Sequence, residues 1–306
     1  MSKDIITAAV VNFNAIWGEK YYNARRMADY MEAAKAKGAD LVVFPEMALT
    51  GYSDDSLNEA DEKMQKKDAE TLEGECVEFL AKKAEELGIY AAFGMPERDV
   101  EDDSRVYNAA VVVGPEGVVG SYRKIHPALE ETKWCTKGSE PFSFETPWGK
   151  IGVGICYDSY KFHELVRYYT MEGCRMYLNL TALCDVPDYE SLYMTTLGQI
   201  VNTFDQFVLS SNLCGREAPS QLEGGSLRDF GLDHWPDFPG CSMVLGPGAN
   251  NRIHVYTGGL GCKEPGMFLH TIDLSLVRRN FHTMNPLVGE ADVRPYLYID
   301  TFYKQR

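Results

Sequence analysis

Three residues of different chemistry each follow an apolar, strand-like run. Glu46 comes just after residues 41–44, Lys124 follows residues 118–122, and Cys156 ends residues 151–155. Open α/β sheets bind their ligands at the carboxyl ends of strands, so these three side chains can meet at one edge. Amide hydrolysis by a thiol needs a base for the thiol proton, a cation for the tetrahedral oxyanion and an acid for the leaving amine. A glutamate, a lysine and a cysteine supply that set.

The context of Cys156 is the most specific of the three. Residues 152–158 read GVGICYD, and a helical pattern follows within a few positions. A strand, a sharp turn and a helix are typical of a nucleophile elbow. Backbone N–H groups at a helix start favour anions, so we expect them to lower the pKa of the Cys156 thiol and to bind an oxyanion. A buried structural cysteine is the alternative interpretation. The other seven cysteines form no CxxC pair and are expected to be free thiols.

The elements that position these residues alternate between strand and helix. Strands are expected near residues 5–11, 41–44, 89–95, 109–113, 118–122, 151–155, 175–180, 207–211, 241–245, 252–256 and 267–273. Helices are expected before Gly38, over residues 72–87, over about 162–171 and over 189–204. Residues 215–240 form a long loop, and the polar, aromatic tail forms an extended arm. Because helix-linked and hairpin-linked strands continue without a break in composition, one large mixed-sheet α/β domain is predicted.

Composition and charge disfavour several classes of partner. The 306 residues include 45 acidic and 30 basic side chains, a net charge of −15, which disfavours nucleic acid and anionic membrane surfaces. No apolar run approaches the roughly 20 residues of a membrane span, and the N-terminus resembles no signal peptide, so a cytoplasmic protein is expected. The histidines lack metal-ligand spacing and the GxG segments lack a dinucleotide context, so neither a metal site nor a dinucleotide site is expected.

The three motifs together resemble the nitrilase superfamily of carbon–nitrogen hydrolases. Glu46 in FPEMALTGY, Lys124 in YRKIHP and Cys156 in GICYD match the order and context of its Glu-Lys-Cys triad, and further similar segments extend to RPYLY at residues 294–298. The resemblance implies a four-layer αββα sandwich. It also implies a hydrolase domain over residues 1–280 and a C-terminal arm over 281–306 that packs on a partner subunit of a homodimer or larger homo-oligomer.

The resemblance also implies roles for individual residues. Glu46 would be the general base, Lys124 and the Tyr157 N–H would hold the oxyanion, and Cys156 would carry a thioester without any cofactor. Many members have a second glutamate after the lysine, for which Glu130 and Glu131 compete. Residues 129–134, LEETKW, are similar to a Leu-Glu-x-x-x-Trp stretch, which favours Glu130. The same motifs give four candidate substrate-binding residues: Tyr52, Trp134, Tyr157 and Thr181.

The residues after the nucleophile bear on the substrate. Tyr-Asp after Cys156 is similar to the amidase and carbamoylase branches, whereas nitrile hydrolysers usually have Trp-Glu there. We therefore expect hydrolysis of a small linear amide with release of ammonia, with N-carbamoyl (ureido) hydrolysis as the nearest alternative and nitrile hydrolysis behind it. A Cys-His protease and a non-catalytic scaffold are the alternatives from other classes. The acidic 215–240 loop either lines the pocket, where it would suit a cationic or neutral amide, or is solvated surface.

Overall fold

The computed structural model describes residues 2–53, 62–217, 237–250, 252–278, 287–290, 292–294 and 297, with the side chain of Glu130 left out. Its described core contains two six-stranded mixed sheets and a short two-stranded ribbon. Most of the predicted arm over 281–306 and most of the 215–240 loop lie outside the described residues. None of the helices in the described ranges is both long enough and apolar enough to cross a membrane.

The first sheet has the strand order β14-β1-β2-β3-β4-β5. Its strands are β1 (Ile5–Asn12), β2 (Leu41–Val43), β3 (Tyr90–Arg98), β4 (Val106–Gly114), β5 (Gly117–Arg123) and β14 (Gly266–Asp273). The strands β1, β2 and β3 run parallel, and the connections between them carry helices. The strands β4 and β5 form the hairpin that the sequence predicts, and β14 adds antiparallel to β1.

The second sheet has the order β13-β12-β9-β8-β7-β6. Its strands are β6 (Phe142–Phe144), β7 (Ile151–Ile155), β8 (Met176–Thr181), β9 (Phe207–Asn212), β12 (Met243–Pro247) and β13 (Ile253–Gly258). The strands β7, β8 and β9 are parallel, with antiparallel strands on both sides. The two-stranded ribbon pairs β10 (Cys214–Gly215) with β11 (Phe238–Pro239).

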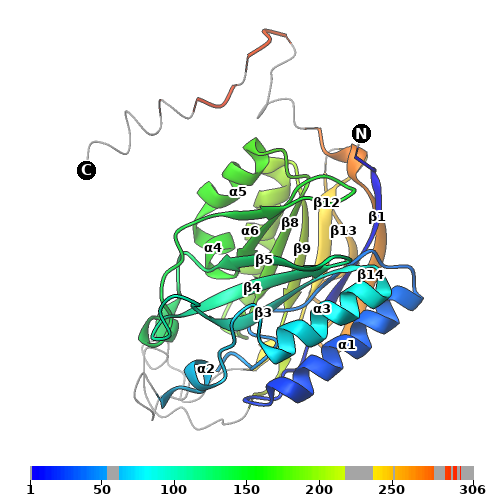
Figure 1. The fold of residues 1–306 in the computed structure, drawn as a ribbon. Coiled ribbons are helices and arrows are strands. Elements are labelled where there is room, and N and C mark those ends of the chain that lie inside the picture. The colour runs from blue at the N-terminus through cyan, green and yellow to red at the C-terminus, as the bar shows by residue number, and fades with distance from the viewer. Residues whose placement is uncertain are drawn as a thin grey trace.

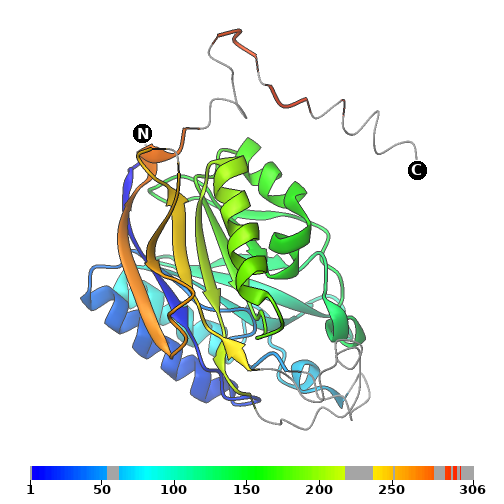
Figure 2. The same cartoon turned by 180° about the vertical axis from the view of Figure 1, so that it is seen from behind.

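Helices cover the outer face of each sheet, which completes four layers (Figures 1 and 2). The helices α1 (Lys20–Ala36) and α3 (Glu75–Leu87) pack on the first sheet. The helices α4 (Tyr157–Lys161), α5 (His163–Met171) and α6 (Tyr189–Phe204) pack on the second. The short helix α2 (Met64–Lys67) and the 3₁₀ turns η2 (Leu129–Lys133) and η4 (Leu274–Leu276) lie in connections. The predicted four-layer α/β sandwich is confirmed.

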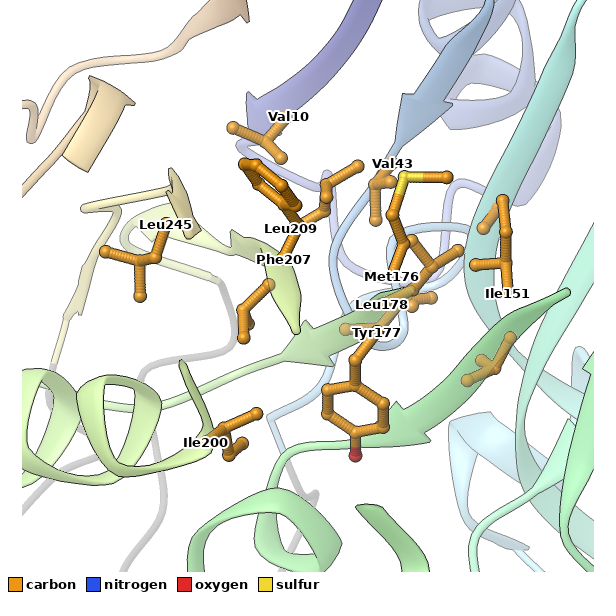
Figure 3. Packing of buried hydrophobic residues seen from close by; sticks show 14 of the residues in the cluster. Val10, Val43, Ile151, Met176, Tyr177, Leu178, Ile200, Phe207, Leu209 and Leu245 are labelled. Atoms are coloured by element: carbon orange, nitrogen blue, oxygen red, sulfur yellow. The ribbon is translucent and has the colours of Figure 1, made fainter. Parts of the chain in front are cut away.

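The side chains of a strand alternate between its two faces, so the second sheet packs on the first sheet with one face and on its own helices with the other. In β8, Met176 and Leu178 belong to the cluster that includes Val43 of the first sheet (Figure 3). The intervening Tyr177 points the other way, and its hydroxyl hydrogen-bonds Ser159 of α4 at 2.8 Å. Because successive side chains alternate faces and both faces are covered, the central strands are apolar almost throughout. A polar side chain in such a strand therefore requires a partner of its own.

Candidate active site

The position of Glu46 depends on a close approach to β3. After β2 the chain turns over Gly94, whose N–H donates to the carbonyl of Pro45 at 3.0 Å, while its own carbonyl accepts from Leu49 N–H at 3.0 Å. A Cβ at residue 94 would lie 2.2 Å from Met47 N and 2.6 Å from Glu46 Cα. Only glycine leaves room for this contact. The turn buries the Glu46 side chain completely.

Lys124 is held on the neighbouring side of the site, just after β5. Its N–H donates to the carbonyl of Asn108 in β4 at 2.8 Å, and its side chain is fully buried. The ammonium Nζ lies 2.7 Å from Glu46 Oε1 and 2.7 Å from Glu131 Oε1. These two bonds to described residues leave one of the three ammonium hydrogens for a further acceptor.

Glu131 occupies the position expected for the second glutamate. It lies on η2, and its Oε1 also accepts from the Tyr52 hydroxyl at 2.6 Å. It is 3% exposed, so its contacts with Lys124 and Tyr52 are made in the interior. The side chain of Glu130 lies outside the described part of the structure. The sequence-based preference for Glu130 as the second glutamate therefore stays a prediction, and Glu131 is the one of the two whose contact with Lys124 the structure describes.

Asn108 and the second sheet complete the binding of Glu46. The Asn108 side-chain amide donates from Nδ2 to Glu46 Oε1 at 2.7 Å. The other carboxylate oxygen, Oε2, accepts from the N–H of Ala182 at 2.8 Å. Ala182 follows β8, so this bond crosses from the first sheet to the second. Both Glu46 oxygens are thus fixed by donors on opposite sides of the site.

Cys156 lies at the sharp turn between β7 and α4. Its φ of 45° and ψ of −102° fall in a region that side chains rarely adopt, which is typical of a nucleophile elbow. Its N–H donates to the carbonyl of Leu180 in β8 at 2.9 Å. The Tyr160 hydroxyl donates to Thr181 Oγ1 at 2.8 Å, and the Thr181 side chain acts to lower the pKa of the Cys156 thiol. Because Thr181 adjoins Ala182, the β8 end contacts both Cys156 and Glu46.

The pKa of the Cys156 thiol is shifted in the direction opposite to the one expected from the sequence. Burial raises the pKa of the Cys156 thiol, and the negative charge of Glu46 adds to the rise, against the opposing effects of Lys124 and Thr181. The expected lowering by a helix start is wrong, because α4 has only 5 residues and the sulfur is buried. A thiol in this site is protonated at neutral pH and requires a base to become a nucleophile.

The charged partners also have shifted pKa values. Burial raises the pKa of Glu46, although Lys124 and the hydrogen bond from Asn108 act against the rise. The pKa of Lys124 is raised above its usual value, because attraction to Glu131 and Glu46 outweighs the opposing effect of burial. Lys124 is therefore a fixed cation, whereas the Glu46 carboxylate holds a proton more readily than an exposed glutamate does.

Asp158 ties the elbow to the segment that carries Lys124. This buried carboxylate accepts from the Tyr122 hydroxyl at 2.8 Å and from the backbone N–H of His126 at 3.0 Å. The His126 ring lies 2.7 Å away through Nδ1 and stacks on Phe162, with ring centroids 3.5 Å apart. Tyr122 and His126 stand on either side of Lys124, so Asp158 sets the distance between Lys124 and the elbow.

The candidate substrate-binding residues take different places. Tyr52 is 9% exposed and binds Glu131, and Thr181 is fully buried beside the sulfur. Trp134 is 5% exposed and belongs to the cluster under the first sheet. Tyr157 is half-buried and meets Phe162 edge to face, with ring centroids 5.3 Å apart. The structure brings Tyr52, Tyr157 and Thr181 into contact with site residues or next to them. Trp134 follows Glu131 by three positions in the sequence.

A buried acid outside the predicted set anchors the Tyr52 segment. The Glu217 carboxylate accepts from the N–H groups of Tyr52 at 2.9 Å and Ser53 at 2.7 Å. Burial raises its pKa against these bonds. Glu217 belongs to the 215–240 loop, which was expected either to line the pocket or to be solvated surface, and the burial of this side chain excludes the second alternative for Glu217. Within the described ranges no group of three or more His, Cys, Asp and Glu side chains is arranged to hold a metal ion.

Curated proteins similar to this chain include hydrolases of nitriles and amides by name. The nitrilase of Pyrococcus abyssi is 35% identical over 170 residues, which cover 55% of this chain and 62% of that protein. The omega-amidase NIT2 of Xenopus tropicalis is 35% identical over 168 residues, covering 51% of this chain and 56% of the relative. The chain thus spans less than two thirds of the length of these relatives.

Solved structures share the fold over nearly the full chain. A mutant of the amidase from Nesterenkonia sp. AN1, with the acetamide moiety of fluoroacetamide added at its active-site cysteine, covers 99% of both chains with a TM-score of 0.72 and 19% identity. Saccharomyces cerevisiae Nit3, a member of branch 10 of the nitrilase superfamily, covers 90% of this chain and 93% of its own with a TM-score of 0.70 and 22% identity. The carbon–nitrogen hydrolase family matches residues 7–228. This match covers more than half of the sequence, and the chain therefore belongs to the carbon–nitrogen hydrolases of the nitrilase superfamily.

Proposed function

We propose that this protein hydrolyses the carbon–nitrogen bond of a small linear amide through a thioester on Cys156. The observation that carries the proposal is the buried cluster of Glu46, Lys124 and Glu131, whose charges act on the Cys156 thiol. The amidase and omega-amidase names among the similar proteins support it. A scaffold without activity has no need of a buried cation between two buried carboxylates, since such groups are costly to bury.

In the first half-reaction Glu46 takes the proton of the thiol while the sulfur attacks the amide carbonyl carbon. The carbon–sulfur bond forms and the carbonyl electron pair moves onto oxygen. The raised thiol pKa makes this transfer necessary, and the raised pKa of Glu46 makes its carboxylate a stronger base than an exposed glutamate. When the carbon–nitrogen bond breaks, Glu46 returns the proton to nitrogen and ammonia leaves.

In the second half-reaction water attacks the thioester carbonyl carbon. Glu46 accepts a proton from the water, the carbon–sulfur bond breaks, and the proton passes to the sulfur as the acid departs. Each cycle restores the protonated thiol and the free carboxylate. Glu46 thus alternates between base and acid, which suits a carboxyl group whose pKa burial has raised.

Two donors suit the negative oxygen of both tetrahedral intermediates. Lys124 has one ammonium hydrogen beyond its bonds to the two described carboxylates. Tyr157 supplies a backbone N–H at the first position of α4, where a helix provides no internal partner. We expect substrate to lie against Tyr52, Trp134, Tyr157 and Thr181, which lie around or close to the cluster. A site this enclosed favours a short acyl group.

Ammonia release from a defined panel tests the proposal. The purified chain is incubated with primary aliphatic amides, terminal amides of dicarboxylic acids, ureido acids and nitriles. We expect ammonia from one or more amides, an acyl adduct on the Cys156 peptide by mass spectrometry, and no ammonia from Cys156→Ala. Cys262→Ala is the matched control and should keep the wild-type rate. Turnover by Cys156→Ala would refute the nucleophile, and ammonia from ureido acids alone would replace the amide assignment with carbamoyl hydrolysis.

A further inference from the structure

We propose that Asn108 is a positioning residue of this site, whose side-chain amide holds the Glu46 and Glu131 carboxylates around Lys124 and keeps Glu46 competent as the base. The inference rests on the proposed function, since it concerns the proton acceptor of that reaction. Asn108 does not touch the sulfur in any described contact, so its effect is exerted through Glu46.

The first support is the place of Asn108 in the first sheet. It lies in the third position of β4, is fully buried, and is polar in an otherwise apolar strand. Its carbonyl accepts the N–H of Lys124 at 2.8 Å, and its own N–H points to Cys135 Sγ at 3.2 Å. The backbone of Asn108 therefore fixes the start of the Lys124 segment.

The second support is the direction of the side-chain amide. Nδ2 donates to Glu46 Oε1 at 2.7 Å and to Glu131 Oε2 at 3.3 Å. The reverse orientation would place the amide oxygen against two carboxylates, so the observed one is fixed by repulsion. Asn108 Oδ1 is buried without a hydrogen-bond partner among the described residues. An asparagine that served stability alone would have hydrogen-bond partners for both Oδ1 and Nδ2. The side chain of Asn108 is therefore oriented so that Nδ2 can donate to the two carboxylates.

The third support is the charge balance of the cluster. Two carboxylates share one ammonium, and a neutral donor supports both without adding a second cation. The hydrogen bond from Asn108 lowers the pKa of Glu46 against the effect of burial. The other titratable groups that act on Glu46 lie on several elements: Lys124, Glu131, Tyr52, Cys135, Cys156 and Cys184. Asn108 is an uncharged side chain that stabilises the carboxylate form of Glu46, on the oxygen opposite to the one bound by the Ala182 N–H.

The test is the pH dependence of Asn108→Leu, a variant whose side chain has the same branching and no donors. We expect kcat on the best amide of the panel to fall about 100-fold with KM within about twofold, because a misplaced base affects the transition state more than binding. We also expect the acid limb of the kcat/KM profile to move up by about one pH unit, because Glu46 loses a donor that stabilises its charge.

The matched control is Asn12→Leu. Asn12 is also a fully buried strand asparagine, but it bonds the carbonyls of Cys262 and Glu264 and the N–H of Ser242. This variant should lose stability and keep the acid limb in place. If Asn108→Leu does not fold, Asn108→Ser is measured instead, because serine is too short to reach both carboxylates. A folded Asn108 variant with the wild-type acid limb would overturn the proposal.

A second measurement separates this proposal from the proposed function. Modification of Cys156 by methyl methanethiosulfonate needs no amide turnover, but at neutral pH it needs the thiol proton to be removed. We expect Asn108→Leu to slow it about tenfold at pH 7, in the same direction as Glu46→Gln. A wild-type rate in Asn108→Leu refutes the positioning role. Absence of ammonia release by the wild-type protein refutes the function instead.

Discussion

Replacing Gly94 by alanine should displace Glu46 without touching any reacting group. The added Cβ would lie 2.2 Å from Met47 N, and contacts below 3.0 Å essentially never occur, so the turn must shift by about 0.8 Å or more. Misplacement of a catalytic group by about 1 Å costs on the order of 100-fold in rate. We therefore expect kcat/KM for amide hydrolysis to fall about 100-fold, while overpacking lowers the free energy of unfolding by about 1–3 kcal/mol.

The assay compares ammonia release and thermal unfolding with those of Gly261→Ala. A Cβ at Gly261 meets nothing within 4 Å, so this variant makes the same chemical change without a clash. It should match the wild-type protein in both rate and unfolding temperature. Should Gly94→Ala remain folded and retain activity within about threefold of wild type, the argument that backbone contact positions Glu46 would be wrong.

Two further predictions follow from the elbow. Asp158→Asn replaces one of the two oxygens that accept from Tyr122 and His126 with a donor, so it should destabilise the protein by about 1.5–3 kcal/mol and lower kcat. Asp29→Asn, at an exposed position, should do neither, and chemical denaturation and initial rates test both variants. In Glu46→Gln, the rate at which methyl methanethiosulfonate modifies Cys156 should be slow at pH 7. This rate should continue to increase above the pH at which an ordinary thiol is fully ionised, because burial raises the pKa of the Cys156 thiol. A plateau near pH 9 would contradict the burial argument.

The sequence was sufficient for the elements that carry the triad. The predicted runs before Glu46, Lys124 and Cys156 correspond to β2, β5 and β7, because short apolar runs rich in Val and Ile and bounded by turn residues favour strands. The spacing of residues in the sequence does not decide between Glu130 and Glu131, for a local reason. These residues lie on a 3₁₀ turn, where neighbours point about 120° apart, and no spacing rule says which one faces Lys124.

Asn108 was missed because its role depends on contacts distant in sequence. Glu46 lies 62 positions away, and the two meet only when β2, β3 and β4 pair in the observed register. One signal was available: an asparagine within VYNAAVVVG stands in a strand that is buried on both faces, where an amide needs a partner. The same reasoning could not identify Asp158, because the start of a helix tolerates an acid without further cause.

The cluster is built from both sheets, and this division has a mechanical consequence. Glu46, Lys124 and Asn108 come from the first sheet, whereas Cys156 and Ala182 come from the second. The bonds from Ala182 to Glu46 and from Tyr122 to Asp158 cross between them at 2.8 Å each. A sliding of one sheet against the other would therefore change the distance between base and nucleophile before it opened the core. Substitutions of buried residues between the two sheets, such as Val43 and Leu178, should accordingly reduce kcat. The same substitutions among the residues under α1 and α3 should need a larger loss of stability to reduce kcat equally.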